Sequence, residues 1–401
     1  MKFFASLYNL LKRKTNTMSF IPQIDGLRFL AIMMVVLYHI NIFVTVKVPF
    51  SFIRSTSDYW WMFQLLDSDR KGVFLFFVIS GFILALPFAR AARQEGKPVS
   101  LPNYYLRRLT RLEPPYFLVM TACFFGILFL RGHEFAASFP HTFTGLLPRL
   151  AASLVYMHNI IFPQYLSVNP VAWSLEIEVQ FYLLVPLLVK VFKLPAAWRR
   201  AVLVAAVTLF IFLQQLFHPP VYTLFNYIQY FLVGFLLVDL YLSQIKFKIS
   251  SLVSLTVGLL CLLFIGYVDL RPHNYMEYIF PAVILVFYLL VMTDQVWIKI
   301  FSLRVLTAIG GMCYSIYLLH YNIIPLVGNT TIFHNISRSY PVVYAWQGMI
   351  LLPIVLLVSA IFYLLIERPC MDKDWPIKLW QFIKKIFRRQ ESQISTPSTA
   401  E

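Results

Sequence analysis

The chain has 401 residues, of which 59% are hydrophobic and only 13% are charged. A soluble protein carries about 25% charged residues, so this composition, with its repeated long apolar runs, excludes an ordinary soluble domain and indicates a membrane protein. Lys and Arg number 34 against 18 Asp and Glu. These basic residues gather at the ends of the apolar runs, so their excess indicates membrane topology and not a nucleic-acid partner.

The N-terminal residues 1–20 are basic and amphipathic. They contain no small-residue cleavage site, so they predict an interfacial helix and not a removed signal peptide. A membrane span needs about 20 mostly apolar residues. The rest of the chain therefore predicts an all-α polytopic membrane protein with about ten transmembrane helices in a single domain, residues 21–370. The ten predicted spans cover residues 24–46, 72–89, 114–131, 173–190, 201–217, 223–242, 250–268, 276–293, 305–327 and 343–366.

The first predicted span contains the stretch RFLAIMMVVLYHI, with Arg28 near one end and His39 near the other. On an α-helix these residues lie about 20° apart around the axis and roughly 16 Å apart along it. Ionisable groups inside a span are costly and mark a functional path or a buried partner. One interpretation is a ligand that lies along this helix, with an anionic part at Arg28 and a reacting part at His39. The alternative is a snorkelling arginine and a histidine that is hydrogen-bonded within the bundle.

The second predicted span carries Ser80 and Gly81 in its middle. Glycine there permits close approach by a ligand or by another helix, and close helix packing is the simpler interpretation. The segment NYYLRRLTRLEPPY follows, with Arg107, Arg108 and Arg111. Clustered guanidinium groups suit phosphate, because they bind oxyanions in a bidentate way. Anchoring to anionic lipid gives the same pattern.

The stretch 144–162 is apolar but contains Pro148, Arg149 and His158. A re-entrant or surface helix explains it better than an eleventh span.

The fourth predicted span begins WSLEIEVQFYLLVP, and it places Glu178 about as far below the outer surface as His39. A carboxylate that holds and polarises an imidazole is a recurrent general-base device, so we expect Glu178 to orient His39. The ninth predicted span, with GMCYSIYLLH, places Ser315 in mid-membrane and His320 in the outer half. Hydrogen bonding between helices explains these two residues as well as a site does.

The distribution of basic residues predicts the topology. With the N-terminus inside, 25 of the 34 Lys and Arg lie in inner segments and 8 in outer loops, while Arg28 lies within a span. This bias predicts that both termini are cytoplasmic. The tail, residues 371–401, is basic and then polar, which is typical of a disordered segment. The four cysteines occur singly and no His/Asp/Glu cluster has ligand spacing, so neither a disulfide framework nor a metal site is predicted.

Six stretches together resemble the acyltransferase-3 family of integral membrane acyltransferases. They are IDGLRFLAIMMVVLYH, FFVISGF, RRLTRLEPPY, WSLEIEVQFYLLVP, YSIYLLH and IERP, in the family's order over about residues 20–370. The resemblance implies ten membrane spans in the cell (inner) membrane. It also implies transfer of an acyl group, commonly acetyl from acetyl-CoA, to a hydroxyl of an extracytoplasmic glycan or lipid-linked sugar.

The family's motifs can be matched to this chain residue by residue. The resemblance places the catalytic residues at Arg28, His39 and Glu178, and the residues that bind the donor at Ser80, Arg107, Arg108, Arg111 and Ser315. The chain departs from the usual pattern at Phe29, Phe74, Glu176, Val179 and Cys313, which leaves the acceptor open. About 30 residues follow the last predicted span, so we expect the standalone membrane form without the esterase-like domain that some members carry.

Residues and resemblance agree on a mechanism without a metal. The phosphates of cytoplasmic acetyl-CoA would lie against the arginines, and the thioester would meet His39. His39 would then act as a general base or carry the acyl group itself. The alternative function is a non-enzymatic transporter or flippase for a lipid-linked sugar, because charges inside the membrane also mark transport paths. The sequence leaves the acyl chain, the acceptor and the oligomeric state open.

Overall fold

The structure is a computed structural model, and all regular elements in the part of the chain that it describes are helices. Most of the predicted N-terminal segment, residues 1–20, and most of the tail, residues 371–401, lie outside the described residues, so the expectations for both stay predictions. The described residues are 8, 10–13, 20–47, 59–66, 70–129, 142–217, 219–244, 249–270, 275–332, 339–372, 374–378, 380–381 and 384.

The helices follow one another through short connections. The α-helices are α2 (Pro22–Lys47), α4 (Trp60–Leu66), α5 (Lys71–Ala92), α6 (Leu101–Phe129), α7 (Phe143–Leu154), α8 (His158–Ile161), α9 (Trp173–Leu188), α10 (Ala196–Phe217), α11 (Ile228–Leu242), α12 (Ser251–Tyr267), α13 (Met276–Thr293), α14 (Gln295–Phe301), α15 (Arg304–Gly311), α16 (Cys313–Thr331), α17 (Tyr340–Phe362) and α18 (Arg368–Cys370). The 3₁₀-helices are η3 (Pro170–Ala172), η4 (Val189–Lys193) and η5 (Leu224–Asn226), and η6 (Tyr363–Glu367) is a π-helix.

Six helices in the described part of the chain are long and apolar enough to cross a membrane, namely α2, α5, α6, α10, α13 and α17. Large apolar side chains cover the outward faces of the bundle. On α10, for example, Phe212 is 53% exposed and Leu216 is 57% exposed. Such a surface suits contact with lipid tails, so the predicted class of an all-helical, multi-pass membrane protein is confirmed. The count of ten spans and the orientation of the termini stay predictions.

Three of the predicted spans are shorter helices. The helices α9, α11 and α12 have 16, 15 and 17 residues. At 1.5 Å per residue they reach about 22–26 Å, while the hydrocarbon core is about 30 Å thick. Their length alone therefore does not establish three further crossings. In the stretch 144–162, α7 has only 12 residues, which is too short to span, in keeping with the predicted re-entrant or surface helix.

The predicted ninth span, residues 305–327, is divided into α15 and α16, with Met312 between them outside helical geometry (φ −101°, ψ 17°). The glycine pair before this break explains it. A Cβ added to Gly310 would lie 1.7 Å from the carbonyl oxygen of Asp25, so the backbone of α15 lies directly against α2. Only glycine permits this approach, and two consecutive glycines weaken helix continuity.

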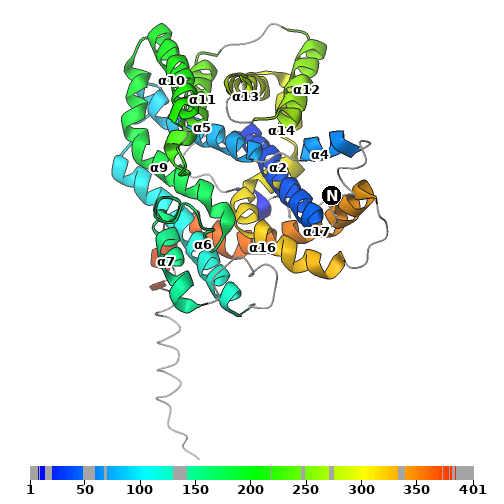
Figure 1. Ribbon diagram of the computed structural model, residues 1–401. Helices are drawn as coiled ribbons and strands as arrows, with labels where there is room; N and C mark the ends of the chain where they lie inside the picture. Colours follow the sequence, from blue (N-terminus) through cyan, green and yellow to red (C-terminus); the bar gives the residue numbers. More distant parts are fainter. Residues whose placement is uncertain are drawn as a thin grey trace, which may run out of the picture.

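The helix α2 lies in the middle of the bundle, between a group formed by α10–α13 and a group formed by α6, α7, α16 and α17 (Figure 1). It contacts α5, α15, α16 and α17. Leu27, Ile32 and Val36 on α2 are fully buried. Arg28 and His39 are therefore both carried by a helix that neighbouring helices surround.

The helices α5 and α11 pack with their backbones in contact. A Cβ on Gly81 would lie 2.2 Å from the carbonyl oxygen of Phe231, and a Cβ on Gly234 would lie 2.4 Å from that of Val78. Gly81 is thus explained by helix packing, and this contact holds α5 at the depth and rotation that present Ser80 to the site described below.

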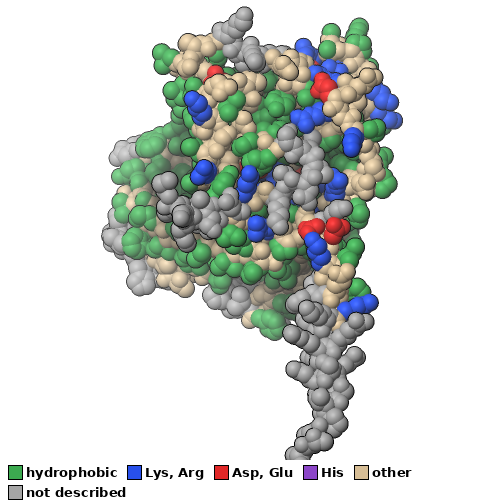
Figure 2. Space-filling model, turned by 180° about the vertical axis from the view of Figure 1, so that it is seen from behind, with side chains coloured by type: hydrophobic (Ala, Val, Ile, Leu, Met, Phe, Trp, Pro, Cys, Tyr) green, Lys and Arg blue, Asp and Glu red, His purple; other side chains and the backbone are tan. Residues whose placement is uncertain are grey.

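Lys and Arg side chains are spread over the face seen in Figure 2, which is opposite to the view of Figure 1. One buried cluster ties three helix ends together. Asp239 near the end of α11 is fully buried, and it pairs with Arg93 just after α5 at 3.0 Å, with Arg200 on α10 at 2.6 Å, and with Arg199. The end of α5, the start of α10 and the end of α11 therefore share one side of the bundle, as the predicted topology requires.

Candidate active site

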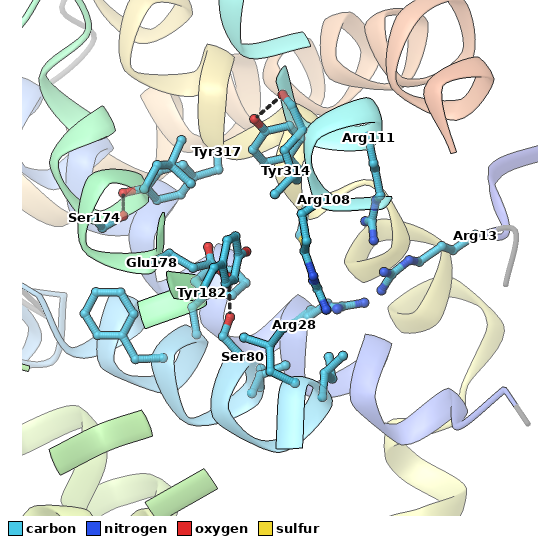
Figure 3. A pocket seen from close by; sticks show the side chains of 18 residues that line it. Arg13, Arg28, Ser80, Arg108, Arg111, Ser174, Glu178, Tyr182, Tyr314 and Tyr317 are labelled. Carbon is cyan, nitrogen blue, oxygen red and sulfur yellow. Dashed lines mark hydrogen bonds between the residues drawn. The ribbon is translucent and has the colours of Figure 1, made fainter. Parts of the chain in front are cut away.

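A pocket of about 100 Å³ lies between α2, α5, α6, α9 and α16. Arginines occupy one side of it, and a carboxylate with its hydrogen-bonded partner occupies the other (Figure 3). Such a volume accepts a small anionic group or an extended arm, and not a whole nucleotide. The polar side chains that line it are Arg13, Arg28, Ser80, Arg108, Arg111, Ser174, Glu178, Tyr182, Tyr314 and Tyr317.

Arg28 is held inward and does not snorkel. Its Nη1 donates to Oδ1 of Asp25 at 2.7 Å, and its side chain is 12% exposed. Arg13, from the chain before α2, places its Nη1 3.9 Å from the same oxygen. The side chain of Asp25 is only 4% exposed, so this carboxylate fixes both guanidinium groups at the pocket.

Arg111 on α6 faces the buried carboxylate of Glu367, at 3.9 Å from its Oε1. The other oxygen of Glu367 accepts hydrogen bonds from Ser315, at 2.6 Å from its hydroxyl and 3.1 Å from its backbone N–H. Ser315 is itself fully buried and does not line the pocket. Within the described residues, Glu367 thus links the predicted donor-binding residue Ser315 to Arg111.

Arg108 differs from the other arginines of the pocket. Its guanidinium lies over the rings of Tyr182 at 5.1 Å and Tyr104 at 5.6 Å. Within the described part of the chain it forms no ion pair with a carboxylate. Arg108 therefore presents to the pocket a positive charge that two aromatic rings hold and that no described carboxylate pairs.

Arg107 does not belong to the pocket. It lies about 100° from Arg108 around α6, and its side chain is exposed. The structure thus brings Arg108 and Arg111 of the predicted triple cluster together with Arg28, and it leaves Arg107 on the surface, where anchoring to lipid headgroups explains it.

Glu178 on α9 accepts a hydrogen bond from the hydroxyl of Ser80 on α5, with 2.5 Å between the oxygens. Both residues line the pocket opposite the arginines (Figure 3). The expected pairing of Glu178 with His39 is therefore not the one that the structure describes. The pairing was expected because both residues have a similar predicted depth in the membrane. In the structure, α9 directs the carboxylate of Glu178 toward α5 and not toward the outer half of α2.

His39 pairs with His320 on α16. Nδ1 of His39 lies 3.2 Å from Nε2 of His320, and the ring centroids are 4.8 Å apart. His320 is fully buried, while His39 is half-buried. Within the described residues, His320 and not the expected Glu178 therefore contacts the imidazole of His39.

The carbonyl groups beside the two histidines define their neutral tautomers. Nδ1 of His39 lies 2.8 Å from the carbonyl oxygen of Val35, and Nδ1 of His320 lies 2.9 Å from that of Ile316. A carbonyl oxygen can only accept, so each Nδ1 carries the proton. Nε2 of His320 then accepts from the same N–H of His39. Neutral His39 consequently carries its basic lone pair on Nε2, on the side of the ring away from Val35.

One aromatic side chain connects the histidine pair to the pocket. The ring of Tyr317 lines the pocket and lies 5.8 Å from the ring of His320. The hydroxyl of Tyr317 donates to the carbonyl oxygen of Val171 at 2.7 Å and lies 2.7 Å from the hydroxyl of Ser174. Neither His39 nor His320 lines the pocket, and Tyr317 lies between the pocket and the histidine pair.

Sequence reasoning missed two residues of this arrangement, and it missed the pairing of a third. Glu367 stands in the IERP motif, but it follows a long apolar run that predicts only a span end. Arg13 belongs to the N-terminal segment, whose amphipathic pattern gives no indication of a pocket. His320 was recognised as an intramembrane histidine, and its spacing from Ser315 on one helix says nothing about a partner on α2.

The helical membrane bundle thus holds an arginine-lined pocket and, outside the lining of that pocket, a pair of facing imidazoles. Among the described residues, no three His, Cys, Asp or Glu side chains gather as a metal site would require. These features are typical of a membrane-embedded enzyme of the group-transfer class.

Comparison with known proteins identifies the family. The acyltransferase domain of the acyltransferase-3 family matches residues 21–364, so the chain belongs to this family. The peptidoglycan O-acetyltransferase OatA of Listeria monocytogenes is 26% identical over 90% of this chain and 57% of its own length. The O-acetyltransferase OatA of Staphylococcus aureus is 26% identical over 91% of this chain and 59% of its own.

A further Staphylococcus aureus protein, from strain COL, is 25% identical over 92% of this chain and 61% of its own length. The chain therefore spans about three fifths of the length of these relatives. No solved structure matches it.

Proposed function

We propose that this protein is an O-acyltransferase of the cell (inner) membrane. It moves an acyl group, in the first place acetyl, from cytoplasmic acyl-CoA to a hydroxyl of an extracytoplasmic glycan or lipid-linked sugar. The observation that carries the proposal is the arrangement along α2, where Arg28 lines the arginine pocket and His39, roughly 16 Å further along the helix, meets His320. The names of the two OatA relatives support acetyl as the acyl group, and the name of the Listeria monocytogenes relative supports peptidoglycan as the acceptor.

Donor binding follows from the charges of the pocket. Arg28 and Arg111 are partly compensated by Asp25 and Glu367, while Arg108 lacks a carboxylate partner in the described chain. Phosphate groups of CoA at the mouth of the pocket complete the coordination of Arg108 by charge-assisted hydrogen bonds. The narrow volume then admits the pantetheine arm, whose amide groups can hydrogen-bond to Glu178 on the opposite side.

The reaction begins when Nε2 of His39 takes the proton of the acceptor hydroxyl. The oxygen of that hydroxyl attacks the thioester carbon, the new C–O bond forms, and the C–S bond breaks. The thiolate of CoA leaves and takes the proton from the imidazolium. In the second form of the mechanism Nε2 of His39 attacks the thioester carbon first, and the C–S bond breaks with release of the CoA thiolate. The acceptor hydroxyl then attacks the acyl carbon, the C–N bond to His39 breaks, and the hydroxyl proton passes to the thiolate. The tautomer with the proton on Nδ1 suits both forms.

The direction of transfer rests on the topology. The split of 25 Lys and Arg in the predicted inner segments against 8 in the predicted outer loops supports a cytoplasmic arginine pocket and cytoplasmic termini. A reporter enzyme fused after Glu401 tests this orientation. Activity of a reporter that works only in the cytoplasm is expected, and activity of one that works only outside would reverse the direction proposed here.

Acyl transfer is tested with purified protein and membranes that contain the acceptor. Acetyl-CoA labelled in the acetyl group is supplied, and two quantities are measured: release of the CoA thiol and label in the glycan and lipid fractions. We expect both to depend on the protein and to rise together. A transporter or flippase would release no thiol, and this result would reject the enzyme.

A further inference from the structure

A second cavity, of about 480 Å³, lies beyond the arginine pocket along α2 and α5, the two helices that line both. The helix α2 contributes Tyr38 to this cavity and Arg28, ten residues earlier, to the pocket. The helix α5 contributes Phe74 to this cavity and Ser80, six residues later, to the pocket. The cavity therefore lies toward the opposite end of the bundle. Its volume is within the range of small-molecule sites, about 300–1,000 Å³.

A buried amide in this cavity lacks a hydrogen-bond partner. Gln229 on α11 is 3% exposed and lines the cavity. Its Nε2 donates to Oε1 of Gln214 and to the carbonyl oxygen of Asn226, both at 3.0 Å. Its Oε1 has no hydrogen-bond partner within the described part of the chain. An unsatisfied buried acceptor costs about 1–3 kcal/mol, so this oxygen is aimed at a ligand group that donates.

The charges around the cavity balance. Arg70 and Lys71 contribute two positive charges, and Asp269 and Glu277 contribute two negative ones. Lys71 is 5% exposed, and its ammonium donates to the carbonyl oxygen of Gly266 at 2.6 Å. In contrast to the arginine pocket, this cavity offers no excess positive charge to phosphates, so it does not suit CoA.

Amides and aromatic rings form the rest of the lining. Gln214, Asn226 and Gln229 present donors and acceptors, while Tyr227 and Tyr230 present ring surface and hydroxyl groups. Hydroxyl groups of a ligand are satisfied by such amides, and the C–H groups of a sugar ring pack against aromatic rings. The combination therefore suits an uncharged ligand that is rich in hydroxyl groups.

The cavity comes close to the reacting histidine. The ring of Tyr38 lies 5.1 Å from the ring of His39. The ring of Tyr227 lies 5.7 Å from that of Phe77, and Phe77 lines the arginine pocket. The aromatic side chains of Phe77 and Tyr227 thus separate the two cavities, and Tyr38 of the second cavity adjoins His39.

We propose that the cavity around Gln229 binds the acceptor, and that it selects an uncharged sugar ring whose hydroxyl is delivered to His39. This assignment rests on the proposed acyl transfer. It adds where the acceptor binds. It also adds the chemical class of the acceptor, which follows from the balanced charge of the cavity and from the amide oxygen of Gln229.

Direct binding tests the assignment. The full chain is purified in a detergent without a sugar headgroup and titrated with the methyl glycosides of glucose, N-acetylglucosamine and glucuronic acid. We expect saturable binding of at least one uncharged glycoside and much weaker binding of the glucuronoside. Gln229→Leu should weaken uncharged-glycoside binding at least tenfold, with unchanged affinity for acetyl-CoA. The matched control is Gln347→Leu, because Gln347 is also buried, on α17, and accepts from Thr331 away from the cavity.

Three binding results would overturn the assignment. They are no saturable binding of either uncharged glycoside by the parent protein, equally tight binding of the glucuronoside, and equal behaviour of Gln229→Leu and Gln347→Leu. If Gln229→Leu does not fold, the half-buried Gln214 gives a milder variant, Gln214→Ala, with the same expected loss.

Inverted membrane vesicles supplied with labelled acetyl-CoA show whether the acceptor sugar belongs to a lipid-linked molecule or to a polymer. Label on an uncharged sugar supports the assignment, in the solvent-extractable fraction for a lipid-linked acceptor or in the insoluble fraction for a polymer. Label on a charged sugar or on a non-sugar overturns it. Thiol release without glycoside binding would contradict the acceptor site alone, whereas glycoside binding without thiol release would contradict the proposed acyl transfer.

Discussion

His39 and His320 are 281 residues apart in the chain, and their imidazoles meet with 3.2 Å between Nδ1 and Nε2. Each ring also lies against the carbonyl oxygen four residues before it, at Val35 and Ile316. The two helices thus hold the pair in one tautomeric state, with the basic nitrogen of His39 directed away from its own helix.

This pairing predicts that His320 positions His39. In His320→Ala we expect kcat for acyl transfer to fall about tenfold to a hundredfold, which is less than the full contribution of about 10²–10⁴ from a general base. His320→Gln keeps an acceptor for the Nδ1–H of His39 and should restore part of the rate. The measurement is kcat as a function of pH, and its acidic limb should move in His320→Ala. An unchanged pH profile without rescue by glutamine would mean that His320 only packs.

Arg108 and Arg107 form a matched pair of neighbouring arginines, one over Tyr182 in the pocket and one exposed. Arg108→Ala should weaken acetyl-CoA binding about 10-fold to 100-fold, because a hydrogen bond to a charged group contributes about 1.5–3 kcal/mol. Arg107→Ala should bind as the parent does. Isothermal titration with CoA measures both, and equal affinities in the two variants would assign the whole cluster to membrane anchoring.

Gly81 and Gly234 fix the crossing of α5 and α11. Alanine at either position places a methyl group against backbone atoms of the partner helix, so we expect a loss of about 1–3 kcal/mol in stability. Gly348 on α17 has open space around its Cβ position, and Gly348→Ala is the control. Thermal unfolding in detergent compares the three. A Gly81→Ala protein as stable as Gly348→Ala would argue against this helix crossing.

Glu178 and Glu176 lie two residues apart on α9 with different partners. Glu178 accepts from Ser80 in the pocket, whereas Glu176 accepts from the backbone N–H of Asn159 at 2.8 Å. Glu178→Gln should therefore lower acyl transfer while stability is kept, and by less than His39→Ala does. Glu176→Gln should lower stability while the rate per folded molecule is kept. Stability and acyl-transfer rate are measured on the same preparations. A loss of rate in Glu176→Gln and a loss of stability in Glu178→Gln would contradict this assignment.

The sequence predicted those features of the site that depend on the geometry of a single helix. Arg28 and His39 share a face because their spacing fixes it, and the structure places Arg28 at the pocket. The break at Met312 was missed because the hydropathy of residues 305–327 is continuous, although the adjacent glycine pair was a usable signal. Partners across helices were beyond this reasoning. The rotation of α9 decides that Glu178 meets Ser80, and no spacing within α9 reveals it.

Buried polar groups in otherwise apolar helices were the second limit. Gln229 lies in an apolar helix. That its Oε1 lacks a hydrogen-bond partner among the described residues follows only from the packing of α10 against α11. The same holds for Glu367, whose contact with Ser315 joins the end of η6 to the start of α16, 52 residues earlier in the chain.

The most direct test of the central claim is acyl transfer by His39→Ala, with acetyl-CoA affinity measured on the same preparation. The base is removed while the arginine pocket, roughly 16 Å away along α2, is untouched. We therefore predict that transfer to the native acceptor is abolished and that acetyl-CoA binds as tightly as to the parent. His39→Gln, which keeps a hydrogen-bonding side chain, should fold as the parent does and be equally inactive. Retained turnover in a well-folded His39→Ala protein would contradict the account.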